Sequence, residues 1–505
     1  MNKKERLCGI LCHPTSFPSP YGVGDIGENA FEFVSVLAEN HIRLWQILPL
    51  GPTGFGDSPY AARSTFAGNE LLISIKNLYI AGYIELEDIL SVDEVKSERV
   101  DYGKAKSVKM PLLHKAASNF IANEAKESEA YSAFLKKNSW WLDDYALFQV
   151  LQDKFNDTRW YSKWPEELKR RDADAIEEAV ATYKDEIEIW KVLQFFFYSQ
   201  WERLKHHANS NGISIIGDIP IFVAPDSVDA WVNTKLLKFS PSLKQETSSG
   251  VPPDAFSPTG QLWGNPTYRW SEHEKDKFSW WVKRLSQAFT LTDIVRIDHF
   301  RGFSACWEVP ITEKTAENGK WVKGPGDKLF RRFREVFGED LPIIAEDLGV
   351  ITPDVEKLRD ENGFPGMKIL EFSFSFKEDG TFDAGNAYLP HNIDYNSVVY
   401  TGTHDNDTLV GWYDSLDEGY KDLVRRYFEA PDDQIAWKMI RSALLSRAKY
   451  AIFPMQDILM LPSSARMNIP STCGPSNWSW RMSKEDIHSP NFTHLAYLMK
   501  FAGRD

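Results

Sequence analysis

The sequence has 505 residues, of which 43% are hydrophobic and 26% are charged, and its formal net charge is −14. This composition is typical of a globular protein with a large core, and the acidity argues against a nucleic-acid partner, which would need a basic stripe. A chain of this length would ordinarily divide into several domains, although an α/β barrel with long loops can exceed about 400 residues as one unit.

The first residues contain a single apolar run, Leu7 to Cys12, which His13 and Pro14 end. This run is shorter than the core of a signal peptide or a membrane span, so we expect neither a leader nor a membrane partner. Cysteines at positions 8, 12, 306 and 473 match neither a disulfide framework nor a zinc-type spacing. We therefore expect a cytoplasmic protein that holds no metal and no other cofactor.

Eight short apolar runs, each ending in small or polar residues, predict eight strands. They are Leu7–Cys12, Arg43–Leu50, Ile213–Ile221, Asp293–Phe300, Pro342–Leu348, Met367–Phe372, Ser397–Thr403 and Tyr450–Ile458. The runs do not alternate cleanly, which is typical of strands buried on both faces. Because helical patterns separate several of them, we predict a (β/α)₈ barrel of the TIM type. A doubly wound open sheet is the alternative, but no Gly-rich phosphate loop follows any run.

We expect one catalytic domain over residues 1–505, with two insertions. About 160 residues separate the second and third runs, too many for a plain crossover, and residues 52–212 predict a mostly helical insertion. Residues 224–275, rich in Pro, Ser, Gly and aromatic residues, predict an ordered, loop-rich insertion over the C-terminal mouth of the barrel. Fewer than fifty residues follow the eighth run, which leaves no room for a C-terminal β-sandwich.

Four acidic residues close the third, fourth, fifth and seventh predicted strands: Asp218, Asp298, Glu346 and Asp405. Active sites of such barrels lie at the C-terminal ends of the strands, so these side chains would gather on one rim. Each acid alone is equally well explained by a structural salt bridge. The set of four is harder to explain in that way, because unpaired buried carboxylates are costly.

The neighbours of these acids suggest separate roles. Arg296 and Asp298 are two residues apart on one strand and face the same side, so the guanidinium would lower the pKa of Asp298 and keep it ionised, as a nucleophile requires. Glu346 has no adjacent cation, and like charges with apolar walls would raise its pKa, which suits a general acid and base. Retaining glycosidases divide the work in this way, with carboxyl groups about 5–5.5 Å apart. His404 and Asp405 would then bind sugar hydroxyls.

The four strand-end segments resemble the signature regions of the α-amylase superfamily. Three further stretches, Gly56 to Tyr60, Ser64 to Leu71 and Gly250 to Pro266, are similar to amylomaltases, the 4-α-glucanotransferases also called disproportionating enzymes. The similarity runs along nearly the whole chain. It implies a TIM barrel that transfers α-1,4-glucan segments by a retaining double displacement through a covalent glucosyl-enzyme.

By this resemblance Asp298 is the nucleophile, Glu346 the acid and base, and Asp405 the stabiliser of the transition state. The resemblance also implies sugar contacts from Tyr60, Asp218, Trp263, Arg296, His299, His404 and Asn468. The implied partners are maltooligosaccharides, amylose and other α-1,4-glucans, with glucose as an acceptor.

Three other functions stay open on the residues alone. A hydrolytic α-amylase-like enzyme would use the same carboxylates, because water and a sugar hydroxyl enter the same site. A metal-dependent barrel hydrolase is disfavoured, because the strand ends offer only His13, His299 and His404. A non-catalytic glycan-binding protein would need no protonated acid beside an ionised one. We interpret Asp347, next to Glu346, as a structural residue on the opposite side of its strand.

Overall fold

The structure, a computed structural model, describes residues 5–253 and 257–505. Eight parallel strands form one sheet in the order β10-β11-β12-β1-β2-β3-β6-β9. They are β1 (Leu7–Leu11), β2 (Leu44–Gln46), β3 (Ser214–Pro220), β6 (Ile294–Asp298), β9 (Ile343–Ala345), β10 (Gly366–Ile369), β11 (Ser397–Tyr400) and β12 (Tyr450–Pro454). Each overlaps one of the eight predicted runs.

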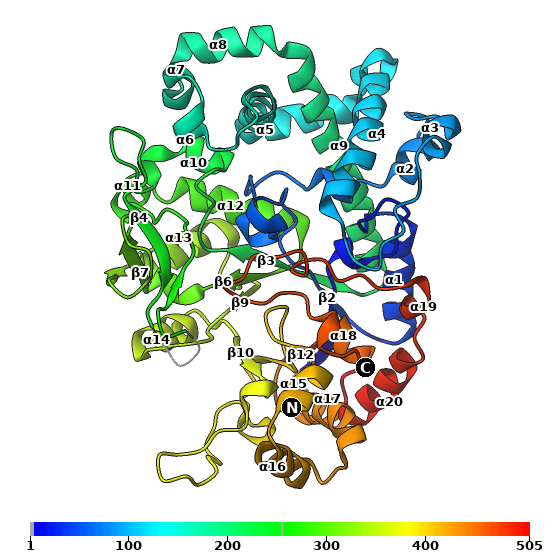
Figure 1. The fold of residues 1–505 in the computed structure, drawn as a ribbon, viewed down its shortest axis with the longest axis vertical. Helices are drawn as coiled ribbons and strands as arrows, with labels where there is room; N and C mark the ends of the chain where they lie inside the picture. Colours follow the sequence, from blue (N-terminus) through cyan, green and yellow to red (C-terminus); the bar gives the residue numbers. More distant parts are fainter. Residues whose placement is uncertain (1–4, 254–256) are drawn as a thin grey trace.

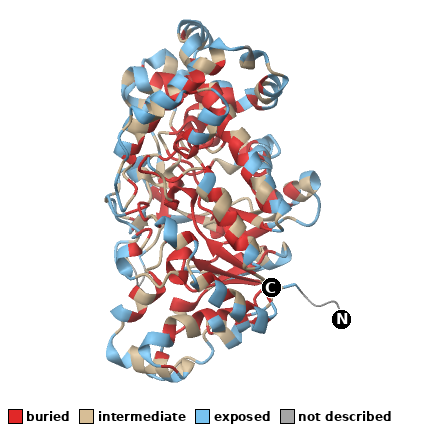
Figure 2. Ribbon diagram, turned by 90° about the vertical axis from the view of Figure 1, so that its right-hand side faces the viewer, coloured by how far each residue is buried: buried red, intermediate tan, exposed pale blue. Residues whose placement is uncertain are grey.

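The two outer strands of this sheet meet, so the sheet is nearly closed. The backbone N–H of Ala345, at the end of β9, donates to the carbonyl of Pro365, just before β10, over 3.0 Å. All residues of β11 and β12 are buried, and the buried strands run through the centre of the molecule in Figure 2. The TIM-barrel prediction is therefore confirmed, and the open-sheet alternative is wrong.

Helices follow the strands and cover the outside of the barrel. They include α1 (Glu28–Glu39), α12 (Ser279–Leu291), α13 (Asp327–Phe337), α14 (Pro353–Glu361), α15 (Leu409–Ser415), α16 (Glu418–Phe428) and α17 (Ile435–Leu445). After β12 the chain forms α18 (Met455–Ile458), α19 (Lys484–Ile487) and α20 (Asn491–Ala502). These described C-terminal residues contain no strand.

The chain between β2 and β3 is mostly helical. Its helices are α2 (Ile75–Ile80), α3 (Leu86–Leu90), α4 (Tyr102–Ala122), α5 (Glu129–Phe155), α6 (Trp160–Lys163), α7 (Glu166–Arg170), α8 (Ala173–Thr182) and α9 (Lys184–Ser210). Most of them gather at one end of the molecule in Figure 1, and α9 returns the chain to β3. Within the described residues, no helix is long and apolar enough to span a membrane.

The segment between β3 and β6 contains more than the predicted ordered loop. Besides α10 (Val228–Val232) and α11 (Trp270–Lys275), it has β4 (Thr247–Val251) and β5 (Gln261–Leu262), which join β7 (Ala305–Pro310) and β8 (Lys320–Lys323) in an antiparallel sheet of order β5-β4-β7-β8. Sequence patterns missed this sheet for two reasons. The partner strands come from a distant stretch after β6, and Thr247–Val251 (TSSGV) carries almost no apolar alternation.

Candidate active site

Strand register brings the predicted acids to one rim of the barrel. Asp218 on β3 lies opposite Arg296 on β6, and Ile297 lies opposite Ala345 on β9. Asp298 and Glu346 therefore follow at the C-terminal ends of neighbouring parallel strands. A cleft of about 310 Å³ opens here, and its lining includes Tyr60, Trp263, Asp298, His299, Asn468 and Trp478.

Arg296 joins two of the acids. Its Nη1 donates to Oδ2 of Asp218 at 2.6 Å, and its Nη2 donates to Oδ1 of Asp298 at 2.9 Å. Asp218 Oδ2 also accepts from the hydroxyl of Tyr60 at 2.8 Å. The guanidinium is buried. Its charge is therefore little screened by solvent and acts strongly on both carboxylates.

Glu346 is held by backbone donors rather than by a cation. Its Oε2 accepts from the N–H of His299 at 2.7 Å, and its Oε1 accepts from the N–H of Leu348 at 2.8 Å. His299 adopts a left-handed backbone conformation, with φ +52°, which is uncommon for a residue with a side chain. That conformation aims its N–H at the neighbouring strand end.

The two carboxyl groups titrate as an interacting pair. Burial, and then the negative charge of Asp298, raise the pKa of Glu346 to about 8. Burial also raises the pKa of Asp298, and this effect outweighs the lowering by Arg296. The prediction of a lowered Asp298 pKa is thus wrong, because adjacency in sequence does not show desolvation. Asp298 still loses its proton first, since only Asp298 has the guanidinium within hydrogen-bond distance.

Asp405 lies in the loop after β11 and is fixed mainly by residues that follow β12. Its Oδ1 accepts from the amide of Asn468 at 2.7 Å, and its backbone carbonyl accepts from Arg466 Nη2 at 2.6 Å. His404 Nε2 lies 3.5 Å from its Oδ2. The Asp405 side chain keeps 47% of its surface exposed.

The chain matches the family model described as 4-alpha-glucanotransferase, glycoside hydrolase family 77, over residues 12–487. The chain belongs to the 4-alpha-glucanotransferase family. Members of this family transfer glucan segments between sugar chains, which is a transglycosylation on α-1,4-glucans.

Relatives agree with this assignment over almost their full lengths. The 4-alpha-glucanotransferase of Thermus thermophilus is 46% identical, with 94% of this chain and 95% of that protein covered. The enzyme of the same name from Synechocystis is 44% identical, with coverages of 99% and 98%. The structure of the amylomaltase from Streptococcus agalactiae in complex with acarbose is similar with a TM-score of 0.94 at 38% identity, covering 99% of this chain and all of that one.

The two aromatic residues that the resemblance implies as sugar contacts, Trp263 and Tyr60, have different surroundings. Trp263 follows β5, and its ring meets the His299 ring edge to face, with centroids 4.7 Å apart. Tyr60 instead stacks on His404, with centroids 5.0 Å apart and planes 18° apart. One face of Tyr60 is therefore covered by an imidazole. The contact that Tyr60 makes with the acidic residues of the site is the hydrogen bond from its hydroxyl to Asp218.

Two buried histidines near the site, His299 and His13, are neutral donors or acceptors rather than charged groups. Burial, and next Arg301, lower the pKa of His299 to about 3, and burial, and next His404, lower that of His13 to about 3. Nε2 of His299 and Nδ1 of His404 are buried without a hydrogen-bond partner in the described structure. A bound hydroxyl could satisfy either nitrogen. Among the described residues, no group of three or more His, Cys, Asp or Glu side chains is placed to hold a metal ion.

Sequence reasoning did not find two neighbours of the site. Trp478 packs against both Tyr60 and His404, with ring centroids 5.6 and 5.8 Å apart. His13, weighed only as a metal ligand, is buried near His404 and accepts from the N–H of Leu48 at 3.2 Å. Trp478 lies in a long C-terminal loop without periodicity, so no sequence signal separates it from core aromatics.

Asp347 is structural, as interpreted from its alternation with Glu346. Its Oδ1 accepts from the N–H of Met367 at 2.7 Å, and its Oδ2 pairs with Arg359. It therefore joins β9 to β10 and helix α14, away from the cleft. Glu346 and Asp347, adjacent at one strand end, therefore have separate sets of partners.

Proposed function

We propose that the chain moves α-1,4-glucan segments from a donor to the 4-hydroxyl of an acceptor glucan or glucose, with Asp298 as nucleophile and Glu346 as acid and base. The donors would be maltooligosaccharides, amylose or other α-1,4-glucans. The four cysteines are free and three of them are buried, which supports a reducing compartment such as the cytoplasm.

In the first half-reaction the proton of Glu346 passes to the bridging oxygen while Asp298 attacks the anomeric carbon. The bond from that carbon to the bridging oxygen breaks, and the reducing-end fragment leaves with the proton. A covalent glycosyl ester on Asp298 remains. In the second half-reaction Glu346, now ionised, removes the proton of an acceptor 4-hydroxyl, whose oxygen displaces Asp298 and restores the α configuration.

The observation that carries this proposal is the difference in proton affinity between the carboxyl groups of Glu346 and Asp298. Glu346 has a pKa raised to about 8 by burial and by the charge of Asp298, so it holds a proton at neutral pH. Asp298 has Arg296 at 2.9 Å, which favours its ionised form over that of Glu346. A protonated acid beside an ionised nucleophile is the starting state of a retaining double displacement.

The other predicted residues surround this pair in ways that suit a glucosyl ring. Asp405 presents a partly exposed carboxylate that would stabilise positive charge on the ring in the transition state. Asp218 has its Oδ1 buried without a partner in the described structure, and a sugar hydroxyl would satisfy it. Trp263 would support an apolar sugar face, because it lines the cleft beside His299.

A trapping experiment tests the covalent step. A 5-fluoro-α-glucosyl fluoride forms its ester quickly and loses it slowly, so mass spectrometry of the intact protein should show one added fluoroglucosyl group. Peptide mapping should place that group on Asp298, and Asp298→Asn should carry none. An adduct on another residue, or none on a protein that turns over the fluoride, would contradict the assignment.

Transfer in preference to hydrolysis requires that the intermediate be shielded from water. The loop at residues 250–266 and the segment near Tyr60 would provide this cover, because Trp263 and Tyr60 both line the cleft; residues 254–256 of the loop lie outside the described residues. Incubation with maltotriose should give a ladder of longer products plus glucose, whereas an α-amylase-like hydrolase would give only shorter ones. Deletion of residues 252–259 should lower the ratio of transfer to hydrolysis. An unchanged ratio would rule out the shielding role.

A further inference from the structure

The loop that carries Asp405 is backed by two buried carboxyl groups that the mechanism does not use. Glu371 follows β10 and is 9% exposed, and Asp457 follows β12 and is fully buried. The loop itself, residues 401–409, runs from the end of β11 to helix α15. These carboxyl groups therefore reach the loop from the strands on either side of β11.

A continuous set of hydrogen bonds leads from Glu371 to the backbone of Asp405. Glu371 Oε2 accepts from the side-chain amide of Asn406 at 3.1 Å. The Asn406 amide oxygen accepts from both the N–H and the hydroxyl of Thr403, each at 2.9 Å. The Thr403 hydroxyl oxygen then accepts from the N–H of Asp405 at 3.3 Å. Asn406 thus closes a tight turn with Asp405 inside it.

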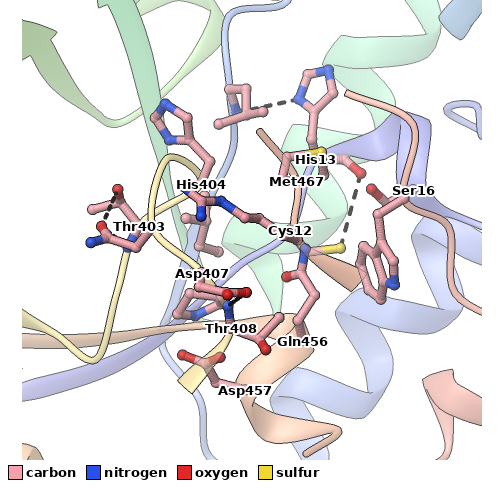
Figure 3. Close-up of a pocket in the computed structure, with 16 residues that line it drawn as sticks. Cys12, His13, Ser16, Thr403, His404, Asp407, Thr408, Gln456, Asp457 and Met467 are labelled. Carbon is pink, nitrogen blue, oxygen red and sulfur yellow. Dashed lines mark hydrogen bonds between the residues drawn. The ribbon is translucent and has the colours of Figure 1, made fainter. Parts of the chain in front are cut away.

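Asp457 holds the two ends of the same loop. Its Oδ2 accepts from the hydroxyl of Thr401 at 2.5 Å, and its Oδ1 accepts from the N–H of Leu409 at 2.8 Å. Figure 3 shows Thr403, Asp407, Thr408 and Asp457 around a small pocket of about 20 Å³ beside the loop. These two bonds therefore tie both ends of the loop to one buried side chain.

Gly402 shows how closely the loop lies against Glu371. A Cβ atom at this position would lie 2.8 Å from Glu371 Oε1 and 3.0 Å from the Asn406 Cβ, so a side chain would displace one of them. Oε1 of Glu371 has no hydrogen-bond partner in the described structure. Burial, followed by the charge of Asp457, raises the pKa of Glu371 well above its ordinary value. The group therefore acts as a neutral acceptor for Asn406.

We propose that Glu371 is a positioning residue for Asp405, which it holds through Asn406 and Thr403 at the distance that the transition state needs. The inference rests on the role proposed above for Asp405. Asp405 has a half-exposed side chain, and Arg466 and Asn468 bind only its backbone carbonyl and its Oδ1. A displacement of about 1 Å at a catalytic group can cost about a hundredfold in rate. The hydrogen bonds that lead from Glu371 through Asn406 and Thr403 to Asp405 therefore matter for turnover.

Two substitutions at Glu371 separate hydrogen bonding from bulk. Glu371→Gln keeps a carbonyl oxygen for Asn406, and kcat on maltotriose should stay within about twofold of the native value. Glu371→Met keeps the length of the side chain but offers Asn406 no acceptor, and kcat should fall about tenfold or more, with KM changed by less than about threefold. A loss of binding rather than of turnover would raise KM instead.

The matched control is Asp407→Asn, one residue beyond Asn406. Asp407 accepts from the Ser463 hydroxyl at 2.7 Å and from the N–H of Thr408, and neither bond leads to Asp405. Its kcat should remain near native. Gly402→Ala, which crowds Glu371 and Asn406, should repeat the fall in kcat and provides a second route if Glu371→Met does not fold.

Normal kcat in Glu371→Met or in a folded Gly402→Ala variant would overturn the proposal. An equal loss of kcat in Asp407→Asn would also overturn it, because the effect would then be a general loosening of the loop. The fluoride trap keeps the two proposals apart. If Asp298 failed to carry the adduct in the native protein, the mechanism would fail, while the contrast between the Gln and Met variants would still report on Glu371.

Discussion

The backbone N–H of His299 donates to Oε2 of Glu346 across 2.7 Å, from the end of one barrel strand to the end of the next. The bond depends on the left-handed conformation of His299, one residue after Asp298. The strained residue therefore ties the carboxyl group of Glu346 to the strand end that carries Asp298. Backbone strain of this kind costs about 1–3 kcal/mol and is retained where the surrounding structure enforces it, often at active sites.

Replacing Glu346 by Gln should lower kcat on maltotriose by several orders of magnitude. The variant has no proton to give to the bridging oxygen and no base for the acceptor, and general acid–base catalysis alone contributes about 10²–10⁴-fold. Asp347→Asn is the matched control. Asp347 contacts Arg359 and Met367 rather than the cleft. The Asp347→Asn variant should therefore keep a kcat near the native value while its Tm falls. Near-normal turnover in Glu346→Gln would remove this residue from the mechanism.

The pH dependence of kcat/KM should be bell-shaped, with its alkaline limb near pH 8. Glu346 must be protonated in the free enzyme, and its pKa is raised to about 8, so activity is present below that pH and declines above it about tenfold per unit. Asp298 must be ionised, and burial raises its pKa above the ordinary value, so activity declines again as the solution becomes acidic. Initial rates with a neutral maltooligosaccharide assign both limbs to the enzyme. A plateau that continues to pH 9.5 would contradict the Glu346 assignment.

The strands and the acids were predictable for the same reason. Strands of a barrel are buried on both faces and therefore read as short apolar runs, and each run ends where a polar side chain can reach the mouth. Asp298 and Glu346 stand at such ends, so their proximity follows from the alignment of parallel strands. Their roles were also suggested by Arg296, since residues two apart on a strand share a face.

What could not be predicted depends on contacts between distant segments. Asn468 is implied by the resemblance as a sugar contact, but its bond to Asp405 comes from a loop without periodicity. Asn406 carries no sequence signal, because its partner Glu371 follows a different strand. The antiparallel sheet likewise joins residues 247–251 to residues 305–310. The raised pKa of Asp298 could not be predicted either, because it comes from burial in the folded site and not from the neighbouring residues in the sequence.

The stability of the protein should also report the raised pKa of Glu346. A carboxyl group whose folded pKa lies above its unfolded value contributes stability at low pH, and that contribution is lost as the pH rises through the folded pKa of about 8. Glu346→Gln cannot ionise, so it avoids this loss. Thermal unfolding followed at pH 5 and pH 9 should show the difference in Tm, variant minus native, moving in favour of the variant at pH 9. An identical difference at the two pH values would mean that Glu346 titrates normally.

Tyr60→Phe should reduce kcat/KM by about two- to tenfold, the effect of losing one hydrogen bond worth about 0.5–1.5 kcal/mol. The hydroxyl donates to Asp218 Oδ2 at 2.8 Å, and Arg296 still holds that oxygen in the variant. The ring remains stacked on His404, so the loss is confined to one bond. Tyr131→Phe is a close control, because the Tyr131 hydroxyl also donates to a carboxylate, Oε1 of Glu188, at 2.8 Å, but between helices of the insertion. That variant should keep native kcat/KM; equal losses in both variants would show that the Tyr60 effect is one of stability and not of the site.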